Sequence, residues 1–153
     1  MSGMNGLSTA MELAVARRDA AAQLVAQARQ GWIAAQLQLD QLDAYAQECT
    51  ARWARQSLNC TPELMRYHYQ FMARLDHAIG LQKGVVTAQL RAVEREASVL
   101  RDAERRVESL RQLVAARLQE ERRAEARREQ KRVDEQAALQ HRRRMAADMG
   151  PML

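Results

Sequence analysis

The segment SLNCTPELMRYHYQFMARLDHAIGLQ, residues 57–82, contains the strongest helix breaker in the body of the sequence, Asn59-Cys60-Thr61-Pro62. Thr61 is a favourable N-cap, and Pro62 at the first helical position lacks an N–H that would otherwise be unpaired. Glu63 places a negative charge in the first turn, where it suits the helix dipole. Helical patterns extend on both sides, so this segment predicts a hairpin of two long helices.

The composition favours helices over sheets. The 153 residues include only 6 Gly and 2 Pro, and the aromatic residues are 2 Trp, 3 Tyr and 1 Phe. So few large side chains cannot fill a thick core, whereas small and medium apolar groups can fill a thin seam between helices. The sequence therefore predicts an all-α protein.

The first predicted helix covers about residues 7–57 and carries a long apolar stripe. Its positions are spaced alternately four and three residues apart, which is the 3.5-residue period of a left-handed coiled coil. Arg18 is the one charged member, and its stem can lie along the seam while its charge reaches water. The stripe consists of Leu7, Met11, Ala14, Arg18, Ala21, Val25, Ala28, Trp32, Ala35, Leu39, Leu42, Ala46, Cys49 and Trp53.

The second predicted helix covers about residues 62–147, after a turn at 58–61. Its heptad stripe is Met65, Met72, Ile79, Val86, Val93, Leu100, Val107 and Val114. Folding the chain about residue 60 places Leu7 opposite residue 113, close to where this stripe fades. We therefore expect a single antiparallel two-helix coiled-coil hairpin over residues 1–153, with an overhanging C-terminal helix. The overhang of roughly thirty residues is about 50 Å long, and i,i+3 and i,i+4 ion pairs such as Asp102–Arg106 and Glu129–Arg132 would support it.

The net charge of +5 is concentrated near the end of the chain, because residues 101–144 carry fourteen basic and nine acidic groups. Acidic residues alternate with the basic ones, and no aromatic residue is present to stack on bases. This pattern is most typical of a solvated charged helix. A docking element for a protein partner is the next interpretation, and nucleic acid is not an expected partner.

The sequence offers no support for enzyme chemistry, a cofactor, a metal or a small-molecule substrate. It contains no phosphate-binding glycine loop, and His68, His77 and His141 lack the i,i+4 partner that would form a metal site on a helix. His68 and His77 are expected to be surface residues. Cys49 and Cys60 do not form a disulfide framework. We find no signal peptide and no apolar run of membrane-spanning length, so a cytoplasmic location is expected.

Most aromatic residues gather near the turn, and two interpretations remain open. The residues are Tyr45, Trp53, Tyr67, Tyr69 and Phe71. They could fill the tip of the hairpin, where two helices need bulk. They could instead form a partner-binding patch, because Gln38, Leu42, Tyr45 and Cys49 lie beside the seam and Phe71, Leu75, Ala78 and Gln82 form a matching stripe.

Several segments resemble the bacterial flagellar FliJ family. They are YHYQFMARLDHAIGLQ (67–82), LDAY (42–45) together with Gly31, and RREQKRVDEQ (127–136). The resemblance covers almost the whole chain, and Cys49 and Gln82 depart from the family pattern. It implies a stalk-like component of the flagellar type III export apparatus, located in the cytoplasm and peripherally at the inner membrane.

The resemblance also implies partners and sites. The partners are the hexameric export ATPase, the export gate membrane protein and the export chaperones. The implied gate-binding patch is Gln38, Leu42, Tyr45, Phe71, Leu75 and Ala78. The implied ATPase-docking tail includes Arg127, Glu129, Gln130, Lys131, Asp134 and Glu135. We expect the patch and the tail to bridge the ATPase ring and the gate.

Three alternatives belong to other functional classes. One is the equivalent stalk of a virulence injectisome, which would share this architecture. Another is an oligomerising coiled coil without an export role, whose mass would depend strongly on concentration. A third is a basic helix that binds RNA or DNA with a steep dependence on salt.

Overall fold

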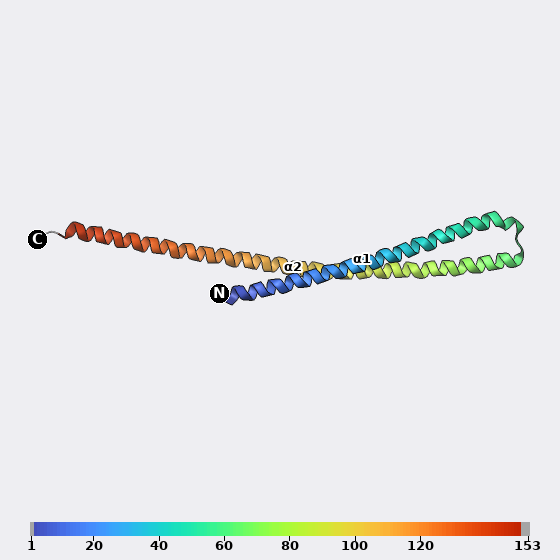
Figure 1. Ribbon diagram of the computed structural model, residues 1–153, viewed down its shortest axis with the longest axis horizontal. Coiled ribbons are helices and arrows are strands. Elements are labelled where there is room, and N and C mark those ends of the chain that lie inside the picture. Colours follow the sequence, from blue (N-terminus) through green and yellow to red (C-terminus); the bar gives the residue numbers. More distant parts are fainter. Residues whose placement is uncertain (1, 151–153) are drawn as a thin grey trace. The chain divides into compact units, whose positions relative to one another are not determined.

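The computed structural model describes residues 2–150 and contains two long helices in that range (Figure 1). Helix α1 is Ser2–Gln56, a short 3₁₀ turn η1 is Ser57–Asn59, and helix α2 is Pro62–Met149. The described residues include no strand. The all-α prediction and the two-helix hairpin are thus confirmed.

The helix ends differ slightly from the predicted ones. Helix α1 begins at Ser2 and so includes Gly3 and Gly6, ahead of the predicted start at about residue 7. The Arg117 guanidinium lies beside exposed Gly3, so close that a Cβ there would be 2.7 Å from Nη1. Helix α2 begins at Pro62 as predicted. Thr61 acts as its N-cap, with the Leu64 amide donating to Thr61 Oγ1 at 3.3 Å.

The chain divides into two compact units. One consists of Glu12–Val107 and the other of Met1–Met11 with Glu108–Leu153. The first, which we call the hairpin unit, contains the turn and most of the buried residues. In it the two helices run antiparallel and side by side (Figure 1).

The register of the hairpin unit is fixed by contacts between the helices. Gln82 bonds to the backbone of Ala35, and Trp53 stacks on His68. Gln89 lies over Gly31. In each pair the two residues are separated from Cys60 by nearly equal numbers of residues along the chain, which agrees with the prediction that the chain folds back at residue 60.

The seam is narrow and rich in alanine. All fourteen positions of the predicted α1 stripe are buried or half-buried. On α2, Met65 of the predicted stripe is instead exposed. The apolar residues Leu90 and, beyond the hairpin unit, Leu118 are exposed as well. The buried residues of the whole described chain are Leu7, Ala14, Ala21, Val25, Ala35, Leu39, Leu75, Ile79, Val107 and Leu110. Small side chains let the two helix axes approach, so a thin core suffices.

The second unit contains the charged end of α2. Leu7 and Leu110 are its buried residues. From residue 125 to 150 every residue is exposed. In this unit the seam is therefore confined to the start of α1 and the adjacent part of α2, as the loss of apolar periodicity after Val114 predicts.

Candidate functional site

An aromatic pair joins the two helices on the surface of the hairpin unit. The rings of Tyr45 on α1 and Phe71 on α2 meet edge to face, with centroids 6.1 Å apart and an angle of 87° between their planes. Tyr45 is 44% exposed and Phe71 is 41% exposed. This edge-to-face geometry is favourable for aromatic rings. The pair therefore presents a half-solvated apolar surface that joins the two helices.

The structure divides the implied gate-binding patch into exposed and buried members. Gln38 is exposed like Tyr45 and Phe71, whereas Ala78 is half-buried. Leu75 is only 7% exposed and forms a core cluster with Leu39 and Ile79, against which Leu42 packs. The expectation of a continuous outward-facing row is therefore wrong at Leu75, because this residue occupies a seam position.

The phenol of Tyr45 has an altered environment. A hydrogen bond with Cys49 raises the pKa of Tyr45 above its usual value, and the negative charge that a Cys49 thiolate would carry raises it further. Nearby, Arg52 Nη2 lies 2.7 Å from Glu48 Oε1, and this bond raises the pKa of the guanidinium. Tyr45 is thus neutral under physiological conditions, and it offers a phenol hydroxyl and a ring face rather than a charge.

Gln82 is a contact residue that sequence reasoning placed on the wrong surface. Its Nε2 donates to the Ala35 carbonyl at 2.9 Å and to Gln38 Oε1 at 3.3 Å. Gln82 lies in the seam and ties Gln38, a member of the patch, to α2. Counting alternating steps of three and four residues from Met72 reaches Leu75, Ile79, Gln82, Val86 and Gln89. That count could have revealed the polar seam positions.

The aromatic residues near the turn have two different environments. Trp53 stacks on His68 with ring centroids 4.0 Å apart and planes only 5° apart. His68 is half-buried, so the expectation of a simple surface residue is wrong there. Tyr67 and Tyr69 are instead well exposed, as is Leu58 on the turn. Trp53 therefore fills the tip, as one interpretation predicted, while the tyrosines remain available for contact.

The predicted ATPase-docking residues lie on one exposed helical segment in the second unit. Gln130 Nε2 donates to Asp134 Oδ1 at 3.0 Å, and Arg132 Nη2 lies 3.4 Å from Glu129 Oε2. Arg127 pairs with Glu120 at 3.1 Å, across two helical turns. Of the ion pairs expected from sequence, Glu129–Arg132 is present, whereas Asp102 pairs with Arg105 rather than Arg106. The segment combines both signs of charge with the exposed side chain of Val133.

Neither a metal centre nor a membrane-spanning segment is visible in the described range. Residues 2–150 contain no group of three or more His, Cys, Asp or Glu side chains that could hold a metal ion. Within the same range, no helix has a stretch that is long and apolar enough to cross a bilayer. Cys49 and Cys60 are free thiols.

The hairpin, the exposed aromatic pair and the charged helical segment together define an all-α two-helix protein with two chemically different exposed surfaces. A family profile described as "Flagellar FliJ protein" matches residues 4–146. The chain therefore belongs to the flagellar FliJ family, and it is a component of the flagellar export apparatus. No curated protein and no solved structure matches the chain.

Proposed function

We propose that this protein bridges the export ATPase ring and the export gate by using one surface in each unit. The observation that carries this proposal is the presence of two chemically different exposed surfaces on one chain. The aromatic pair Tyr45–Phe71 belongs to the hairpin unit, and the charged segment around residues 127–135 belongs to the other unit.

The gate-binding surface is centred on Tyr45 and Phe71. Aromatic side chains that are already fixed by packing lose little conformational entropy on binding and provide large apolar contact areas. Gln38 adds a polar group beside them, and its bond with Gln82 limits its freedom. In this proposal Leu42, Leu75 and Ala78 support the surface, while Gln38, Tyr45 and Phe71 touch the gate protein.

The ATPase-docking surface is the exposed helical segment that carries Arg127, Glu129, Gln130, Lys131, Asp134 and Glu135. Both signs of charge allow complementary pairing with a partner, which favours specificity and fast association. The exposed Val133 provides an apolar contact within the charged segment. The ATPase hexamer is the partner that we propose for it.

The remaining parts of the proposal rest on family membership. We place the protein in the cytoplasm, peripherally at the inner-membrane export apparatus, with a role in the cycling of export chaperones. We assign no residue to the chaperone role. The match to a flagellar family supports flagellar export over the injectisome alternative.

A binding experiment with purified components tests the bridging proposal. Phe71→Ala with Tyr45→Ala should lose binding to the cytoplasmic part of the gate protein and retain the ATPase. Arg127→Glu with Lys131→Glu should do the reverse. The controls are Leu13→Ala, which truncates an exposed leucine elsewhere on the hairpin unit, and Arg101→Glu, which reverses an exposed charge there. If either double variant lost both partners while remaining fully helical, the proposal of two separate surfaces would fail.

A further inference from the structure

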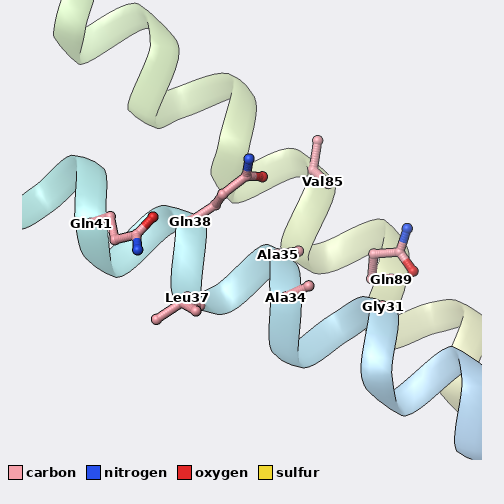
Figure 2. Close-up of a pocket in the computed structure, with 8 residues that line it drawn as sticks. All are labelled: Gly31, Ala34, Ala35, Leu37, Gln38, Gln41, Val85 and Gln89. Carbon is pink, nitrogen blue, oxygen red and sulfur yellow. The ribbon is translucent and has the colours of Figure 1, made fainter.

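A groove lies between the helices of the hairpin unit, farther from the turn than the aromatic pair (Figure 2). Its volume is about 400 Å³. Helix α1 contributes most of the lining, and α2 contributes Val85 and Gln89 (Figure 2). The α1 residues are Gly31, Ala34, Ala35, Leu37, Gln38 and Gln41.

Small residues make the floor of the groove and larger aliphatic residues stand at its edges. Ala34 is exposed and leaves the α1 backbone accessible to a close approach, whereas the side chain of Gln89 lies over Gly31. Leu37 is 57% exposed and Val85 is 44% exposed, which is high for such side chains. Leu81, one turn from Val85 on α2, is also exposed. An exposed apolar area of this kind usually marks a contact surface.

This side of the hairpin unit also lacks charge over a long distance. Residues three, four or seven positions apart share a helix face. The positions that share a face with Gly31 and Ala34 on α1 are Ala20, Leu24, Gln27, Gln38 and Gln41, and those that share a face with Val85 on α2 are Ala78, Leu81, Ala88 and Ala92. The opposite side of the hairpin unit carries Arg29, Asp40, Asp43, Asp76, Lys83 and Glu94. The absence of charge is therefore specific to the groove side.

Arginines border this uncharged area. Arg74 and Arg95 lie one heptad before Leu81 and one heptad after Ala88, on the same face of α2. Arg17 ends the corresponding stripe on α1, one heptad before Leu24. Two acidic residues lie at this border. Glu48 is paired with Arg52 at 2.7 Å, and Glu96 follows Ala92 by one turn on α2. The border thus has an excess of positive charge.

We infer that this groove docks an amphipathic helix of another protein, one whose apolar stripe is bordered by aspartate or glutamate. The separation of Arg74 and Arg95 along α2 is about 32 Å, so the docked helix would need about six turns to reach both. A second copy of this chain is a poorer occupant, because it would bring arginine-bordered faces together. The groove lining shares Gln38 with the proposed gate-binding surface, and the uncharged face around it also includes Ala78. The inference does not depend on that proposal.

Two synthetic peptides test this inference on the full-length protein. Both are stapled helices of about 24 residues with the same Leu and Ala stripe, and one has Glu at the flanking positions while the other has Lys. Fluorescence anisotropy should show that the Glu-flanked peptide binds and that salt weakens its binding. The Lys-flanked peptide should bind at least about tenfold more weakly.

Variants then locate the binding site. Ala34→Glu puts a carboxylate into the groove and should weaken binding by about tenfold or more. Its matched control, Ala22→Glu, changes an exposed alanine on the other side of α1 and should have no effect. Arg74→Glu combined with Arg95→Glu should reverse the preference toward the Lys-flanked peptide. Circular dichroism checks that each variant is folded.

Several results would overturn the inference. Equal binding of both peptides would show that the groove does not select acidic flanks. Failure of the Glu-flanked peptide to bind would show that the groove does not dock such a helix. Binding that Ala34→Glu leaves unchanged would place the site elsewhere. Self-association of the protein that Ala34→Glu abolishes would assign the face to a second copy instead.

Discussion

The side chain of Gln82 crosses the seam and donates to the Ala35 carbonyl at 2.9 Å. The two residues come from different helices, and Gln82 occupies a position where the apolar period calls for a hydrophobic side chain. Its Nε2 also lies 3.3 Å from Gln38 Oε1. A polar group at one seam position fixes the register of a coiled coil and lowers its stability relative to an apolar residue.

Replacing this polar contact with an apolar one should maintain or raise stability and weaken the preference for a single helix register. Gln82→Leu should leave the free energy of unfolding unchanged or raise it by up to about 1 kcal/mol, since one modest hydrogen bond is lost and apolar area is gained. The variant should self-associate more than the parent protein, as measured by sedimentation. Gln70→Leu, an exposed change on the same helix, is the control. A parent-like mass together with lower stability would contradict the proposed role of Gln82.

Truncation should destabilise the fold more at Leu75 than at Phe71. Leu75→Ala should lower the free energy of unfolding by about 2–3 kcal/mol, because it opens a cavity beside Leu39 and Ile79. Phe71→Ala should cost less, about 1 kcal/mol, because this side chain is 41% exposed and is not part of the buried cluster. Urea unfolding followed by circular dichroism gives both values. Equal losses would mean that Phe71 belongs to the core.

The stack of Trp53 on His68 should appear as a coupling energy. A double-mutant cycle with Trp53→Ala and His68→Ala should give about 0.5–1.5 kcal/mol, the range for paired rings. Trp32→Ala and His77→Ala provide a matched cycle between the other tryptophan and an exposed histidine, and should show no coupling. A value near zero for the first cycle would contradict the observed contact.

The raised pKa of Tyr45 predicts a dependence of stability on high pH. The folded state holds the phenolic proton more tightly than the unfolded chain, whose value is 10.0. The resulting stabilisation is complete below pH 10.0 and is lost as the pH rises through the folded-state pKa. Subtracting the ultraviolet pH titration of Tyr45→Phe from that of the parent protein isolates the titration of Tyr45, whose midpoint is its folded-state pKa. Cys49→Ala should move it back toward 10.0, since the bond with Cys49 is the largest cause.

The sequence predicted the fold well because its signals are local and repeated. The Thr61-Pro62 start of α2 and the unbroken stripe from Leu7 to Trp53 each depend on residues that are close in sequence. Periodicity alone identified which α1 residues are buried. It also indicated where the seam ends on α2.

The site was harder to predict because it depends on whether a residue lies in the seam between the helices or on the surface beside it. Leu75 fits a surface stripe and a seam equally well in sequence, and only packing against Leu39 separates the two. Gln82 was assigned to a surface stripe with Phe71, Leu75 and Ala78, and His68 was expected on the surface, although steps of three and four residues from Met72 place both in the seam. The stacking of His68 on Trp53 depends on the register between helices, which a single helix does not reveal.

The central claim is that one molecule bridges the ATPase and the gate, and a complementation experiment in cells tests it directly. The Tyr45→Ala, Phe71→Ala variant and the Arg127→Glu, Lys131→Glu variant would be expressed separately and together in cells that lack the native protein, with export of flagellar subunits as the measurement. If bridging requires both surfaces on the same chain, the two variants together should export no better than either alone. Restoration of export by co-expression would contradict the bridging account, because one molecule would then bind the ATPase while a different molecule binds the gate.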